Sequence, residues 1–201
     1  MLARGATLAL DSWGMLRAGV PVAAGFLAAG LVGALGGCGD ESSRACATTV
    51  SPEVCATPGN LRAAGTVQVM WVAEPQLELG PEPLADGRYL LTGRALSCGA
   101  DFSPPAEALH VQGAVEISGC VLRATSISAE GAEPEVSVAT FSYGADHTLE
   151  LSDACSASPS EAMAQRYGFD GTTMQLPISV DLLGGDGNSY PCSGVDTYEL
   201  L

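Results

Sequence analysis

The stretch MQLPISVDLL, residues 174–183, decides the fold class because its side chains alternate in character along the chain. Leucine, isoleucine and valine occupy every second position from 176 to 182, and the positions between them are mostly polar. Successive side chains of a β-strand point to opposite faces, so this period of two predicts a strand with one buried face. Pro177 cannot donate a backbone hydrogen bond, which places the strand at a sheet edge or a bulge.

Similar runs of β-branched, aromatic and alternating residues recur along the chain after residue 62. The turn Gly144-Ala145-Asp146 separates two of these runs and predicts a hairpin. Many short strands with turn residues between them are typical of an all-β fold, an antiparallel sandwich or a barrel-like domain. Besides 174–183, strands are predicted at 66–72, 88–92, 111–117, 120–127, 136–143 and 147–151.

One short helix interrupts this β pattern. Ser158-Pro159-Ser160-Glu161 has the form of a capping box with proline at the first helical position. Gly168 can adopt the left-handed conformation that ends a helix. The sequence therefore predicts a helix over 159–167, which is too short to be stable alone and packs on the sheet through Met163 and Tyr167.

The N-terminal part of the chain has the composition of an export signal. Ala18–Gly37 is a run of twenty residues without a charged side chain, preceded by Arg17. A positive segment, an apolar segment and small residues at a cleavage site are the parts of a secretory signal. We interpret residues 1–37 as the signal segment, with the true start at Met15. The alternative is an uncleaved membrane helix, since about twenty apolar residues can span a bilayer.

The end of this segment, Leu35-Gly36-Gly37-Cys38, resembles the lipobox of bacterial lipoproteins. The resemblance implies that Cys38 is fatty-acylated, for example with palmitate, and becomes the first residue after cleavage. In Gram-negative lipoproteins, aspartate directly after this cysteine is associated with retention in the inner membrane. Here Gly39 holds that position, so the resemblance implies a lipid-anchored protein of the cell envelope, in the outer membrane in preference to the inner membrane.

The cysteine count agrees with export. The chain has seven cysteines, and removing Cys38 as the lipid carrier leaves six, an even number suited to disulfides in an oxidising compartment. The alternative, a metal or redox site, usually relies on C-x-x-C spacing, which this sequence lacks. Six cysteines can pair in fifteen ways. The simplest scheme joins neighbours in the sequence: Cys46 with Cys55, Cys98 with Cys120, and Cys155 with Cys192.

The charge of the exported part limits its partners. From Cys38 onward there are 22 acidic residues, 6 arginines and no lysine, so the formal charge is 6 − 22 = −16. Such a surface repels nucleic acid and anionic lipid headgroups. We therefore predict no nucleic-acid partner, and attachment to the membrane through the lipid anchor alone.

Composition also divides the chain after the signal segment. Residues 38–62 hold the lipidated cysteine and a polar, turn-rich tether without periodicity. Residues 63–201 form a disulfide-stabilised β domain of a size that suits a single unit.

No familiar catalytic or cofactor-binding motif occurs in the sequence. We therefore predict a non-catalytic binding or structural domain that requires no cofactor, with an envelope protein or a glycan as its possible partner. The alternative is a hydrolase-like enzyme of the envelope. It would use His110 or His147, the two histidines, as a base together with a carboxylate such as Asp101 or Asp146.

Two further ligand sites are weighed against structural explanations. Asp186 and Asn188 lie in a glycine-rich stretch and supply oxygen ligands suited to calcium, but a glycine-rich hairpin turn explains the same residues. Trp71 with Tyr89 or Tyr143 could form a face on which a sugar stacks, whereas aromatic residues on strands usually belong to the core.

Overall fold

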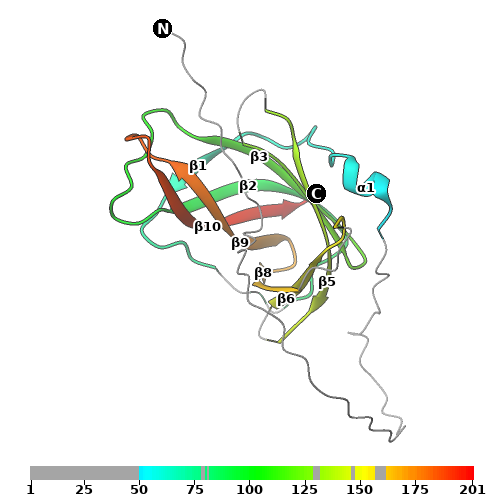
Figure 1. Ribbon diagram of the computed structural model, residues 1–201. Coiled ribbons are helices and arrows are strands. Elements are labelled where there is room, and N and C mark those ends of the chain that lie inside the picture. Colours follow the sequence, from blue (N-terminus) through cyan, green and yellow to red (C-terminus); the bar gives the residue numbers. More distant parts are fainter. Residues whose placement is uncertain (1–49, 78–79, 81, 129–131, 146–147, 157–161) are drawn as a thin grey trace, which may run out of the picture.

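The computed structural model describes residues 50–77, 80, 82–128, 132–145, 148–156 and 162–201. The described residues form one short helix and ten strands (Figure 1). The elements are α1 Pro52–Ala56, β1 Val67–Trp71, β2 Gly87–Ser97, β3 His110–Ser118, β4 Val121–Ile127, β5 Glu135–Tyr143, β6 Thr148–Asp153, β7 Met163–Arg166, β8 Gly168–Phe169, β9 Thr173–Leu183 and β10 Ser189–Leu200.

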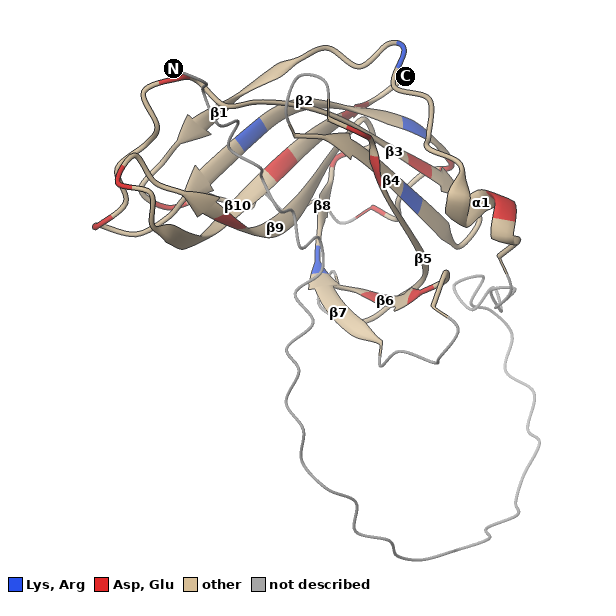
Figure 2. Ribbon diagram, turned by 45° about the horizontal axis from the view of Figure 1, so that its top comes forward, with Lys and Arg blue, Asp and Glu red and all other residues tan. Residues whose placement is uncertain are grey.

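The ten strands belong to one sheet in the order β7-β6-β5-β4-β3-β1-β2-β10-β9-β8, with an additional pairing of β3 with β2. Neighbouring strands run antiparallel except β1 and β2, which are parallel, so the sheet is mixed. The sheet curls until β7, the strand at one end, approaches β9, which is next to the strand at the other end (Figure 2). It does not close into a barrel. The predicted all-β class is confirmed.

The alternating stretch at 174–183 forms β9 as predicted. Met174, Leu176, Val180 and Leu182 are buried on its inner side. The carbonyl of Pro177 accepts a hydrogen bond of 2.7 Å from Gln165 Nε2 of β7, so it points away from β10. In an antiparallel strand, the backbone nitrogen and carbonyl of one residue point to the same side. The nitrogen of Pro177, which carries no hydrogen to donate, therefore also faces away from β10. Pro177 lies at the open side of the sheet, as predicted.

The predicted helix over 159–167 is wrong for residues 163–166. Met163–Arg166 form β7, which pairs with β6 so that Gln165 lies opposite Leu149. Tyr167, directly after β7, is buried. The strand ladder and the burial of this ring outweigh the local helix signal, as tertiary contacts often do. The capping-box residues 158–161 lie outside the described residues.

The largest buried side chains fill the inner face of the curled sheet. A second and smaller cluster lies on the outer face, where Leu61 packs on Ala64, Leu90 and Ala114. The inner cluster includes Tyr89, Leu96, Val115, Leu122, Leu149 and Met174, all almost fully buried.

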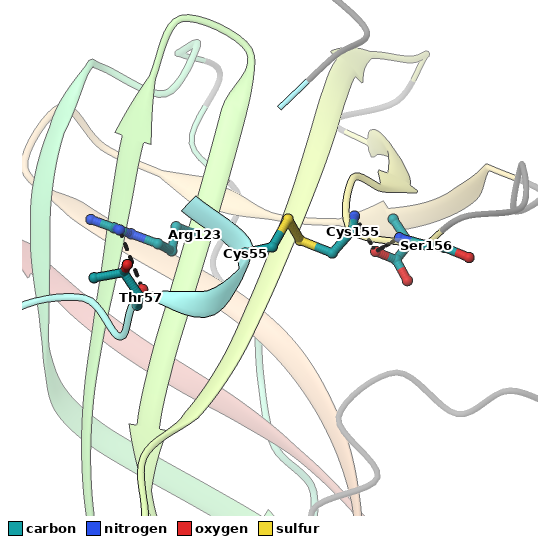
Figure 3. Close-up of a disulfide and its surroundings, with 6 residues drawn as sticks. Cys55, Thr57, Arg123, Cys155 and Ser156 are labelled. Carbon is teal, nitrogen blue, oxygen red and sulfur yellow. Dashed lines mark hydrogen bonds between the residues drawn. A yellow bond between two sulfur atoms is a disulfide. The ribbon is translucent and has the colours of Figure 1, made fainter. Parts of the chain in front are cut away.

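The segment before β1 is attached to the outer face of the sheet, although the sequence predicted a polar tether up to residue 62. It contains α1, and Cys55 in this helix is bonded to Cys155, which follows β6 (Figure 3). Further along, Arg123 of β4 donates a hydrogen bond to the carbonyl of Thr57 (Figure 3). The segment is therefore fixed to the domain from α1 onward.

The simplest disulfide scheme is wrong. Cys55 pairs with Cys155 across 100 residues, and Cys98 pairs with Cys192 across 94 residues. Cys120 is also in a disulfide. Cys98 directly follows β2 and Cys192 lies in β10, the strand beside β2. The Cys98–Cys192 bond is thus set by the adjacency of β2 and β10 in the sheet and not by proximity in sequence.

Candidate functional site

A cavity of about 300 Å³ lies on the inner side of the curled sheet. Its walls come from both halves of the sheet, with β3, β4, β5 and β7 on one side and β2, β9 and β10 on the other. A volume of this size is at the lower end of the range typical of small-molecule sites. The principal lining residues are Arg94, Val115, Leu122, Ala124, Ser126, Glu135, Ser137, Met163, Ala164, Gln165, Leu176, Ile178, Ser179, Val180, Asp196 and Tyr198.

A buried ion pair lies in the wall of this cavity. Arg94 of β2 and Asp196 of β10 are directly opposite each other on neighbouring strands. Their side chains form two parallel hydrogen bonds of 2.6 Å, from Nε to Oδ1 and from Nη2 to Oδ2. The Arg94 side chain is 8% exposed and that of Asp196 1%. This fork-like geometry is the strong form of an arginine–carboxylate contact and cancels the two charges locally.

Tyr198 extends the ion pair into a small polar group. Its hydroxyl donates a hydrogen bond of 3.1 Å to Asp196 Oδ2. Burial, together with the negative charge of Asp196, raises the pKa of Tyr198 well above its ordinary value. Burial alone would lower the pKa of Arg94, but the hydrogen bonds and the charge of Asp196 outweigh it and raise that pKa. The group therefore holds a charged arginine and a neutral tyrosine at physiological pH.

The rest of the lining is largely apolar, with a few polar groups between the apolar ones. Leu122, Ile178 and Val180 supply aliphatic wall, while the hydroxyls of Ser126, Ser137 and Ser179 are polar but uncharged. Mostly apolar walls with a few polar groups are the usual composition of a ligand pocket.

The cavity lies where the sheet fails to close. β7 has four residues and β8 has two, so neither end of the sheet offers a long ladder to the other. β8 pairs only with Gln175 and Met174 of β9. Beyond that point, the side-chain hydrogen bond from Gln165 to Pro177 links β7 to β9. We call this junction of β7 and β9 the seam.

The residues predicted for catalysis are not brought together. His110 is exposed at the start of β3, opposite Gln68, and does not line the cavity. Asp101 is exposed in a turn, and the structure gives no contact between it and His110. His147 and Asp146 lie outside the described residues. Within the described part of the chain, no histidine is within hydrogen-bond reach of a carboxylate.

Asp186 and Asn188, predicted as calcium ligands, are bonded to each other within a turn. Asp186 accepts hydrogen bonds from the backbone and side chain of Asn188 and, at 2.7 Å, from the hydroxyl of Tyr190. The bond from Tyr190, followed by that from the Asn188 backbone, lowers the pKa of Asp186. These contacts fit the alternative interpretation, a glycine-rich hairpin turn. The described residues contain no group of three or more histidines, cysteines or acids that could hold a metal.

The three aromatic residues considered as a sugar-binding face do not share one surface. Tyr89 is fully buried, with its ring edge-on to Phe169. Tyr143 packs on Phe141 and Tyr167. Trp71 instead contacts Phe102 at a centroid distance of 5.0 Å. The core interpretation is confirmed for Tyr89.

The anchor region lies outside the described residues, which begin after Cys38 and Cys46. None of the helices in the described ranges is long and apolar enough to cross a bilayer. Comparison with known proteins found no matching family model, no matching curated protein and no matching solved structure.

Sequence reasoning missed the central residues of the cavity. Arg94 and Asp196 are single charges within otherwise strand-like stretches, 102 positions apart. The only feature of the sequence that could have indicated these two residues is that each is charged at a position where the strand pattern predicts a buried side chain. That signal becomes specific only when the pairing of β2 with β10 is known.

Proposed function

We propose that this protein is a lipid-anchored envelope protein whose β domain binds a ligand in the cavity without catalysing a reaction. The observation that carries the binding function is the cavity itself, with the paired Arg94 and Asp196 in a mostly apolar wall. The anchor is supported by Leu35-Gly36-Gly37-Cys38, and outer-membrane placement by Gly39.

Binding is favoured over catalysis because the strongest polar groups of the cavity are engaged with one another. Asp196 accepts two hydrogen bonds from Arg94 and one from Tyr198, which leaves it a poor general base. A nucleophile needs a base within hydrogen-bond reach, oriented by a third group. Among the described residues that line the cavity, none is a histidine or a cysteine.

The acidic surface supports attachment through the lipid. The acidic segments are spread over loops and strands and basic ones are few (Figure 2). An anionic bilayer surface repels such a domain, so several acyl chains on Cys38 would have to hold it there, each buried methylene contributing about 0.8 kcal/mol.

The anchor is tested by replacing its cysteine. The Cys38→Ser variant, expressed in a bacterium that processes lipoproteins, should move from the membrane fraction to the soluble periplasmic fraction. A Ser43→Ala variant is the control and should stay with the membrane. A Cys38→Ser protein that remains membrane-bound would show that the apolar segment is an uncleaved helix.

The binding function is tested on the same soluble variant by methyl NMR with hexanamide as a small uncharged probe. Saturable shifts are expected at Leu122 and Ile178 in the cavity and not at Met70, which is exposed on β1. Ala164→Trp, a substitution beside the seam, should weaken these shifts. The binding function fails if neither hexanamide nor its charged analogues shift the cavity methyl groups.

A further inference from the structure

We infer that the cavity selects uncharged ligands with an apolar body, and that the Arg94–Asp196 pair sets this preference. The inference rests on the proposed binding function and adds the chemical class of the ligand. It is based on the charges that line the cavity and on which of their hydrogen-bonding atoms are already engaged.

The lining offers no uncompensated positive charge. Arg94 is matched by Asp196 through two bonds of 2.6 Å. The only other ionisable side chain with a formal charge among the described lining residues is Glu135, which is acidic. An anionic ligand could reach Arg94 only by displacing Asp196, which would then be buried without its partner. Anions are therefore excluded.

At Asp196 a cationic ligand faces a similar obstacle, and Glu135, the other acid of the lining, already interacts with another group of the protein. Both carboxylate oxygens of Asp196 already accept hydrogen bonds, from Arg94 and Tyr198. A cation at this site would compete with Arg94 for the same oxygens and bring two positive charges together. It would also lose its hydration in a cavity whose walls are mainly aliphatic, which is unfavourable for any ion.

An uncharged polar group meets neither obstacle. Asp196 engages Nε and Nη2 of Arg94, and no described residue accepts a hydrogen bond from Nη1, whose hydrogens can therefore donate to a carbonyl or hydroxyl oxygen of a ligand. The serine hydroxyls of the lining can donate or accept. The apolar body of the same ligand would lie along Leu122, Ile178 and Val180. A cavity of about 300 Å³ restricts the ligand to a small molecule.

The seam is the route by which such a ligand reaches the cavity. Between β7 and β9 the backbone ladder is replaced by the side-chain bond from Gln165 to Pro177. A side-chain bond can open without disturbing the strands on either side. Met163 and Ala164, which line the cavity from β7, are also exposed to solvent.

The test compares three probes of nearly equal size and different charge, hexanamide, hexanoate and hexylammonium, titrated at pH 7 into the soluble Cys38→Ser protein. Methyl NMR at Leu122 and Ile178 reports binding inside the cavity. Hexanamide should bind at least about tenfold more tightly than either ion. The inference is overturned if an ion binds the cavity as tightly as hexanamide, and the binding function then still stands. If no probe binds, both fall.

A charge-switch variant tests the role of the ion pair. Asp196→Asn keeps the side-chain size but leaves Arg94 with an unmatched charge, so the affinity for hexanoate should rise by about tenfold while that for hexanamide changes little. An unchanged order of the three probes in a folded Asp196→Asn protein would overturn the assigned role of the pair.

A second variant covers the case in which Asp196→Asn does not fold. The double variant Arg94→Met, Asp196→Leu replaces the pair by apolar groups of similar volume, which buried ion pairs often tolerate. It should bind hexanamide several-fold more weakly, because the Nη1 donor is gone, without gaining affinity for either ion. Unaltered hexanamide binding contradicts the inference. Glu116→Gln, which removes a charge from the outer face, is the matched control and should leave all three affinities unchanged.

Discussion

The two faces of the sheet carry two arginine–carboxylate pairs with the same local arrangement. Arg94 faces Asp196 across β2 and β10, and Arg123 faces Glu116 across β4 and β3. In both pairs the residues are directly opposite in antiparallel register. The side chains of the inner pair are 8% and 1% exposed, and those of the outer pair 23% and 25%.

The comparison shows that burial, and not the position of the two residues opposite each other on neighbouring strands, decides how much an ion pair contributes to stability. Water and salt screen the outer pair, so its contribution to stability is small. The inner charges have been removed from water, and each depends on the other to remain buried. The outer arginine also donates to Thr57 and helps to hold the segment after α1, whereas the inner arginine faces the cavity.

The largest effect is expected when the inner pair is broken from one side. Asp196→Ala leaves the Arg94 charge buried without its partner and should lower the free energy of unfolding by about 3–5 kcal/mol. Urea denaturation measures this loss. Asp181→Ala, on the exposed side of β9, is the control and should change the stability by less than about 0.5 kcal/mol. A loss below about 1 kcal/mol for Asp196→Ala would mean that the inner charges are solvated.

The outer face should depend on its disulfide more than on its ion pair. The double variant Cys55→Ala, Cys155→Ala removes the covalent bond between α1 and the end of β6 and should cost about 2–4 kcal/mol. Thermal unfolding with and without reductant measures the effect. If the double variant were as stable as the parent protein, the segment before β1 would be held by its hydrogen bonds alone.

A smaller effect is expected at Tyr198, with a dependence on pH. Tyr198→Phe removes one hydrogen bond to Asp196 and should cost about 1 kcal/mol at neutral pH. Since the pKa of Tyr198 is raised in the folded state, its contribution to stability is fully present below pH 10 and is lost as the pH rises further. The stability difference between the two proteins should therefore narrow above pH 10. Urea denaturation at several pH values checks this, and a constant difference would contradict it.

The raised pKa of Tyr143 contributes to the same alkaline loss in both proteins. Burial raises it to about 12, so its contribution falls between pH 10 and 12 whether or not Tyr198 is present.

The smallest effect is expected at the outer pair. Glu116→Gln should lower stability by about 0–1 kcal/mol, and by less at high salt, because both side chains reach water. Denaturation at low and high ionic strength measures the difference. A loss as large as that of Asp196→Ala would remove the distinction between the two faces.

Local sequence patterns predicted much of the sheet and little of the cavity. The alternation at 174–183 and the turn after Tyr143 are patterns of residues that are close together in the sequence. They therefore predicted β9 and the hairpin strands β5 and β6. β10 was missed because Gly194 and Asp196 interrupt its apolar pattern, and its register shifts between Thr197 and Tyr198. The helix over 159–167 was wrong because a cap is a local signal, which does not report the pairing of β7 with β6 that stabilises the strand.

The Cys98–Cys192 bond and the inner ion pair could not be predicted for a shared reason. Cys98 and Cys192 are brought together by the pairing of β2 with β10, and the same pairing places Arg94 opposite Asp196. Such contacts join residues about a hundred positions apart, and they are specified by strand order, which a single sequence does not state.

A double-mutant cycle on the inner pair tests most directly whether its two charges act as one neutral unit. The free energies of unfolding would be measured for the parent protein, Arg94→Met, Asp196→Leu and the double variant. We expect each single variant to be much less stable than the double variant, with a coupling energy of at least about 2 kcal/mol. The same cycle with alanine at Arg123 and Glu116 should give less than about 1 kcal/mol. Equal and small coupling energies for both pairs would contradict the account.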